Sequence, residues 1–176
     1  MNERIRRHQL AGTAVYIGMG LLMLFMQLMP INPGEPGFPG PDVMLCITCA
    51  WVLRRPDQLP AVIIVAMVLI GDFMLGRPFG LWSLLVLVAT ELLRPRAQRW
   101  TDQAFVFEWL RVSVLIGLML IGYRVLMVLF LLPVPALGSV MLQCLATVAA
   151  YPAVVLMLHL IGVRRLSAAE IELMGH

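Results

Sequence analysis

The chain has 176 residues, of which 61% are hydrophobic and 13% are charged, and its formal net charge is +3. So much apolar surface excludes an ordinary soluble domain of this length, and the polar stretches between the apolar runs are too short to fold alone. Composition therefore predicts an all-α membrane protein with a single integral membrane domain over residues 1–176.

Six apolar runs follow one another along the chain and predict a polytopic bundle of six transmembrane helices. Their expected bounds are approximately 12–29, 42–53, 59–75, 81–93, 104–132 and 139–163. A hydrocarbon core of about 30 Å requires about 20 helical residues, so the second and fourth runs are short. We expect them to thin the bilayer, to borrow flanking residues or to lie partly inside the bundle.

All 13 basic residues are arginines, and their positions predict the orientation of the bundle. With six spans, only Arg77 falls on the outer side, whereas ten arginines fall on the inner side: Arg4, Arg6, Arg7, Arg54, Arg55, Arg94, Arg96, Arg99, Arg164 and Arg165. Arginine-rich loops remain in the cytoplasm, so both termini are expected there. The same clusters attract anionic membrane lipids. They lack the interleaved aromatic residues of a nucleic-acid surface, so no nucleic-acid partner is expected.

A polar motif ends the third apolar run, in residues 71–80, whose sequence is GDFMLGRPFG. Asp72 is the only acid between residues 59 and 90. An ionisable side chain at membrane depth is costly and commonly has both a partner and a function. Gly71, Gly76, Pro78 and Gly80 predict a sharp turn and close helix packing. Asp72 is therefore the first candidate site residue.

Arg124 is the candidate partner of Asp72. It lies about 20 residues into the fifth run, near the outer half of the membrane, where Asp72 is also expected. Pairing with Asp72 would neutralise both charges. The alternative is that Arg124 extends its guanidinium outward to the membrane surface.

A face of small residues in the sixth run is the candidate surface for docking a partner helix. Ala146, Ala149, Ala150 and Ala153 share one side at helical spacing. Association of helices in lipid depends on close backbone approach at small residues. The alternative is that this face packs within the protein's own bundle.

No catalytic, cofactor or metal site is expected. The sequence contains no nucleophile-and-base arrangement, no phosphate-binding loop and no cluster with metal-ligand spacing. Cys46 and Cys49 have the spacing of a redox or metal pair. A structural zinc site needs four ligands, so these cysteines are expected to be small packing residues of one helix.

The order of these features resembles the MreD family, the rod shape-determining inner-membrane proteins of bacteria. The shared features are a basic start, Pro41-Asp42 before the second run, the Arg-Arg-Pro loop at 54–56 and the Gly-Asp-x3-Gly-x-Pro-x-Gly turn at 71–80. The resemblance covers the whole chain in length and span count, and its specific part lies within residues 41–93. Asp72, Gly76, Pro78 and Gly80 fall on the motif positions.

This resemblance implies a non-enzymatic membrane scaffold of the cell-elongation complex, which positions or regulates peptidoglycan synthesis and helps to maintain rod shape. It implies MreC as the main partner, with RodA, a penicillin-binding transpeptidase and MreB as indirect ones. It also implies a location in the bacterial cell inner membrane and a fold similar to the substrate-binding subunits of vitamin-uptake transporters. The alternative function is therefore a small-solute-binding membrane subunit of an uptake transporter.

Overall fold

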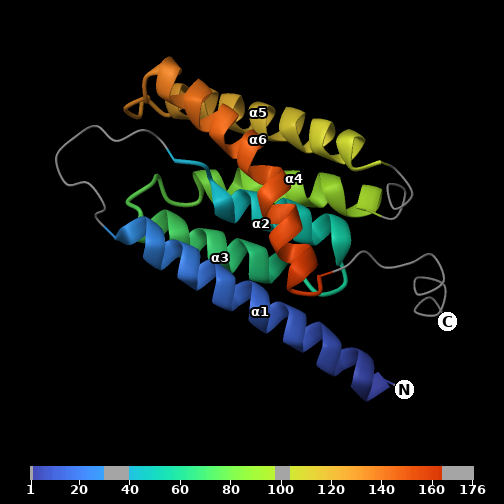
Figure 1. Ribbon diagram of the computed structural model, residues 1–176. Coiled ribbons are helices and arrows are strands. Elements are labelled where there is room, and N and C mark those ends of the chain that lie inside the picture. Colours follow the sequence, from blue (N-terminus) through green and yellow to red (C-terminus); the bar gives the residue numbers. More distant parts are fainter. Residues whose placement is uncertain (1, 30–39, 98–103, 164–176) are drawn as a thin grey trace.

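The computed structural model describes residues 2–29, 40–97 and 104–163, and all the secondary structure in them is helical (Figure 1). These residues form six helices: α1 (Asn2–Leu28), α2 (Val43–Arg54), α3 (Ala61–Met74), α4 (Leu81–Ala97), α5 (Phe105–Leu129) and α6 (Leu137–Leu160). Each expected apolar run coincides with one helix to within a few residues, except that α1 begins earlier, at Asn2. The Pro/Gly-rich segment 30–39 lies outside the described residues.

Successive helices run in opposite directions, so their ends gather in two groups (Figure 1). One end of the bundle holds the starts of α1, α3 and α5 together with the α2–α3 loop. The other end holds the starts of α2, α4 and α6 together with the α3–α4 turn. Arg55, which follows α2, therefore lies at the end of the bundle opposite Arg77, which follows α3.

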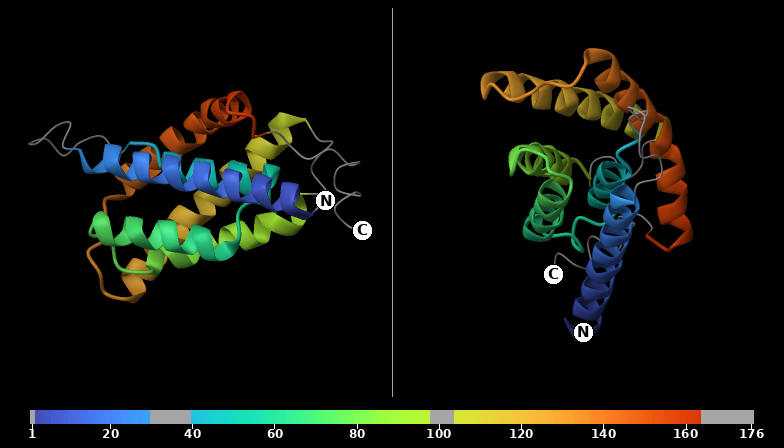
Figure 2. Two further views of the ribbon diagram at one scale, coloured as in Figure 1. Left: turned by 90° about the horizontal axis from the view of Figure 1, so that it is seen from below. Right: turned by 90° about the vertical axis from the view of Figure 1, so that its left-hand side faces the viewer.

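The short helix α2, cyan in Figure 2, lies in the centre of the bundle. It contacts α1, α4 and α6, and all ten of its residues from Leu45 to Arg54 are buried. Trp51 is the largest fully buried side chain, and its ring meets the ring of Tyr16 from α1 edge-on, with centroids 5.8 Å apart. Enclosure by its neighbours explains how a helix of 12 residues can belong to a membrane protein, since it does not need to face lipid along its length.

Three helices are long and apolar enough to cross a membrane: Gln9–Leu28 within α1, Phe105–Leu129 and Leu137–Leu160. The helices α2 and α3 are also apolar but have only 12 and 14 residues. The chain is thus a helical membrane protein with at least these three candidate spans among its described residues.

The outward face of α5 is a continuous apolar stripe. Side chains three or four residues apart along the helix are exposed, at Val106, Leu110, Val114, Leu118, Ile121, Val125 and Val128. Neighbours at this spacing lie on one helix face. An exposed apolar patch of this length is unusual on a soluble monomer, and it suits a surface covered by lipid.

Candidate functional site: the α3–α4 turn

The motif of residues 71–80 forms the connection between α3 and α4. Gly76 lies just past the end of α3 with φ of +62°, and the N–H of Arg77 donates to the carbonyl of Asp72 at 2.9 Å. This left-handed residue and the hydrogen bond behind it make the Schellman motif that commonly ends a helix. Pro78 follows where no helix continues, and Gly80, with φ of +81°, precedes α4. The two positive φ angles explain why both positions are glycine, because residues with a Cβ atom rarely adopt such angles.

Asp72 caps the helix that follows its own. Its side chain is 1% exposed, and its Oδ2 accepts hydrogen bonds from the backbone N–H of Ser83 at 3.2 Å and from the Ser83 hydroxyl at 2.7 Å. Ser83 lies in the first turn of α4, whose N-terminus carries the equivalent of about half a positive charge. The helix end therefore stabilises the buried carboxylate, and the carboxylate joins the end of α3 to the start of α4.

Gly71 allows α3 to approach α1. A Cβ atom at this position would lie 3.3 Å from Cδ2 of Leu24, which is closer than an ordinary contact. Gly71 is itself buried. The first glycine of the motif is thus explained by helix packing, whereas Gly76 and Gly80 are explained by the turn.

A second carboxylate, Asp42, lies beside this turn at the start of α2. Its Oδ1 accepts the N–H of Leu45 at 3.0 Å, and its own N–H donates to the Thr147 hydroxyl at 3.0 Å. Its Oδ2 lies 3.8 Å from Nη1 of Arg77, whose guanidinium is also 5.7 Å from the ring centroid of Trp82. Asp42 therefore connects α2 to α6 and to the α3–α4 turn.

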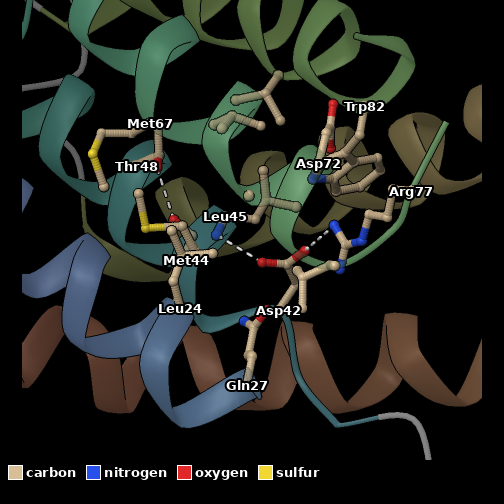
Figure 3. A pocket seen from close by; sticks show the side chains of 14 residues that line it. Leu24, Gln27, Asp42, Met44, Leu45, Thr48, Met67, Asp72, Arg77 and Trp82 are labelled. Atoms are coloured by element: carbon tan, nitrogen blue, oxygen red, sulfur yellow. Dashed lines mark hydrogen bonds and ion pairs between the residues drawn. The ribbon is translucent and has the colours of Figure 1, made fainter. Parts of the chain in front are cut away.

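Both carboxylates line a small cavity of about 30 Å³ (Figure 3). Arg77, Gln27 and Thr48 complete its polar lining. The volume is sufficient for about two water molecules and is far below the roughly 300–1,000 Å³ of a drug-sized ligand site. Among the described residues, Oδ1 of Asp72 is buried without a hydrogen-bond partner.

The expected partner Arg124 is directed elsewhere. Its Nη1 donates a hydrogen bond to the carbonyl of Pro135, in the loop between α5 and α6. The hydrogen bonds of Asp72 come from Ser83 instead. The donors to Asp72 thus lie at the N-terminus of α4 and not on Arg124, the candidate partner expected from the sequence.

The alanine face of α6 lies at the edge of its packed side. Thr147, Tyr151, Val154 and Leu158 are the buried residues of this helix, and α6 packs against α2 and α5. Ala146 and Ala150 lie beside this buried stripe and are half-buried, whereas Ala149 and Ala153 lie on the side away from it and are exposed.

A buried polar cluster that the sequence did not reveal joins three helices. Oε1 of Glu108 in α5 accepts a hydrogen bond from Nη1 of Arg54 in α2 at 3.0 Å and another from the hydroxyl of Tyr151 in α6 at 2.7 Å. Arg54, Glu108 and Tyr151 are 7%, 2% and 0% exposed. The carboxylate of Glu108 is thus directed into the bundle, where it joins α5 to α2 and α6.

The opposite end of the bundle contains a larger cavity, of about 480 Å³. It lies among α1, the α2–α3 loop and α4, and its polar lining comprises Gln9, Thr13, Asp57, Gln58 and Arg94. Arg94 donates to the carbonyls of Pro56 at 2.8 Å and Leu59 at 3.0 Å. Its guanidinium therefore holds the loop in place.

Thiols and metal ligands are dispersed in the described part of the chain. Cys46 and Cys49 are buried free thiols, and Cys46 contacts the carbonyl of Thr147 at 3.4 Å. No three His, Cys, Asp or Glu side chains gather there closely enough to hold a metal ion. Comparisons with protein-family models, with curated proteins and with solved structures find no match to this chain.

Proposed function

We propose that this protein is a non-enzymatic scaffold of the bacterial cell-elongation complex, which helps to maintain rod shape by positioning or regulating peptidoglycan synthesis. The proposal rests on the resemblance of the 71–80 motif to the MreD family. The supporting observation is that the motif residues Asp72, Gly76 and Gly80 each have a specific structural role in the α3–α4 turn. Asp72 caps α4, and Gly76 and Gly80 have positive φ.

The use of polar side chains supports a scaffold over an enzyme. Asp42, Asp72 and Glu108 cap helix ends or bridge helices, and Arg94 fixes a loop. Groups engaged in this way define the shape of the bundle, and shape is what a binding partner recognises.

The proposed location is the bacterial cell inner membrane, with six spans and both termini in the cytoplasm. In support, the arginines of the α2–α3 loop and of the end of α4 lie at one end of the bundle, and Arg77 lies at the other. Reporter fusions after Arg55 and Arg99 are expected to report the cytoplasm, and a fusion after Pro135 the periplasm. A periplasmic signal after Arg99 would contradict the six-span arrangement.

The proposed main partner is the single-span protein MreC, with RodA, the penicillin-binding transpeptidase and MreB reached through the complex. We place the contact on the alanine face of α6, because Ala149 and Ala153 are exposed and would allow close approach of another helix. These two alanines point away from the buried stripe of α6, so their enlargement leaves the core intact.

Co-purification of MreC with double and single leucine variants tests this surface. Ala149→Leu with Ala153→Leu is expected to reduce the recovery of MreC about tenfold while the protein accumulates normally. Ala66→Leu, on the exposed face of α3, is the matched control and should retain MreC. Full recovery with the double variant would show that MreC binds elsewhere. Loss of accumulation would place the face in the protein's own core.

The cavity of about 480 Å³ favours a second candidate function, the solute-binding subunit of an uptake transporter. Its volume falls in the range of small-molecule sites. This second proposal also includes a fold similar to the substrate-binding subunits of vitamin-uptake transporters. The cavity lies at the end assigned to the cytoplasm, whereas an uptake subunit needs a site open to the outside. Identification of proteins co-purified from native membranes separates the two functions, since an ATPase pair would support the transporter.

A further inference from the structure

The small cavity at the α3–α4 turn has one negative charge in excess. Asp42 and Asp72, which are 6% and 1% exposed, contribute two carboxylates, and Arg77 contributes one guanidinium. Four helix ends also meet there: α2 and α4 bring their N-termini, and α1 and α3 bring their C-termini. Because the partial charges of helix ends have opposite signs, they cancel. The side chains leave a formal charge of about −1.

One carboxylate oxygen of each aspartate in this cavity lacks a close hydrogen-bond donor, whereas the other is already bonded to a helix N-terminus. Oδ1 of Asp72 is buried, and no described residue donates a hydrogen bond to it. Oδ2 of Asp42 is 3.8 Å from Nη1 of Arg77, which exceeds the distance of a good hydrogen bond. Thr48 and Gln27 add neutral oxygen atoms to the lining. Carboxylate and neutral oxygen atoms are the ligands that hard cations prefer.

We propose that this cavity binds one sodium ion between Asp72, Asp42 and the neighbouring oxygens. A single monovalent cation balances the excess charge, whereas a divalent ion would overcompensate it. The volume of about 30 Å³ admits an ion of roughly the size of a water molecule.

Bound sodium would stabilise the outer end of the bundle, because its ligands come from α1, α2 and α3. The melting temperature of the purified protein in mild detergent measures this effect. Titration of sodium chloride against choline chloride at constant ionic strength separates sodium binding from screening. At one hundred times the dissociation constant, the ion is expected to raise the melting temperature by about 5–10 °C.

Three variants connect the effect to the cavity. Asp72→Asn keeps an acceptor for Ser83 but removes the charge, and it is expected to abolish the sodium-dependent shift. Asp57→Asn is the matched control, because Oδ1 of Asp57 is also buried without a partner among the described residues but lies at the other end of the bundle. Its shift should persist. Arg77→Gln removes the competing cation, and the sodium concentration at half effect should fall about tenfold.

Several results would overturn the proposal. Equal melting temperatures in sodium and choline would show that no sodium ion binds, and an undiminished shift in Asp72→Asn would place the ion elsewhere. Stability that depends on pH but not on sodium would identify the positive charge as a proton. If Asp72→Asn does not fold, the Arg77→Gln titration decides, since an unchanged midpoint contradicts the site. None of these measurements depends on MreC.

Discussion

Removal of the Glu108 carboxylate should cost more stability than removal of any exposed acid of this chain. Glu108→Ala deletes the bonds that its Oε1 accepts from Arg54 at 3.0 Å and from Tyr151 at 2.7 Å. Hydrogen bonds to a charged group each contribute about 1.5–3 kcal/mol. The Arg54 guanidinium, 7% exposed, would also lose its counter-charge, and breaking a buried pair typically costs about 3–5 kcal/mol. We expect a loss of about 4 kcal/mol.

Unfolding in detergent measures this loss. Purified protein in mild detergent is titrated with sodium dodecyl sulfate, and tryptophan fluorescence gives the free energy of unfolding of each variant. The control is Glu91→Ala, because Glu91 also pairs with an arginine, Arg94, at 3.0 Å but is 47% exposed. An exposed pair contributes about 0–1 kcal/mol. Equal losses for the two variants would refute the importance of burial.

A double replacement separates the charge from the packing at this cluster. Arg54→Met combined with Glu108→Leu removes both charges and keeps the volume, and it should recover most of the stability that Glu108→Ala loses. The reason is that a buried ion pair can be replaced by apolar side chains at little cost, whereas one unpaired buried charge is strongly destabilising.

Three further predictions concern single residues of the bundle. Gly76→Ala should lower the free energy of unfolding by about 1 kcal/mol, because φ at this position is +62° and a side chain disfavours this backbone conformation. An unchanged free energy of unfolding would show that the turn relaxes. Leu131→Gly should raise the free energy of unfolding by a similar amount in the same titration, because Leu131 has φ of +55° and is 95% exposed. A lower free energy of unfolding would mean that the leucine side chain makes stabilising contacts. Maleimide labelling of the folded protein should modify Cys144 first, since Cys46 and Cys49 are fully buried; rapid labelling of either buried thiol would indicate local opening of α2.

The helices could be predicted from the sequence because hydrophobic runs and their Pro and Gly boundaries are local signals. The run expected at 42–53 is α2 at Val43–Arg54, and the run expected at 81–93 begins with α4 at Leu81. The turn chemistry of Gly76 and Gly80 is local as well, and both glycines have positive φ. Asp72 stood out because it is the only acid within a long apolar stretch.

The partners of the buried charges could not be predicted, since they depend on which helices are neighbours. Arg54 and Glu108 are 54 positions apart, and they meet because α4 and α6 each pack against both α2 and α5. Arg54 looks from the sequence like an orientation signal, because it stands at the end of an apolar run. Asp72 is a similar case. The sequence offers the distant Arg124 as its candidate partner, whereas its donors are the N–H and hydroxyl of Ser83, only 11 positions away.

The central position of α2 has a consequence for how the chain is assembled during synthesis. Helices leave the ribosome in order, so α2 is made well before α6, although α6 forms one of its main contacts. Until then the thiol of Cys46 lacks its contact, because the carbonyl of Thr147 has not yet been made. A helix of 12 residues is a weak insertion signal by itself. The N-terminal part of the bundle therefore remains open until the last helix closes over it, and this interval is when chaperones and quality-control proteases have access to α2.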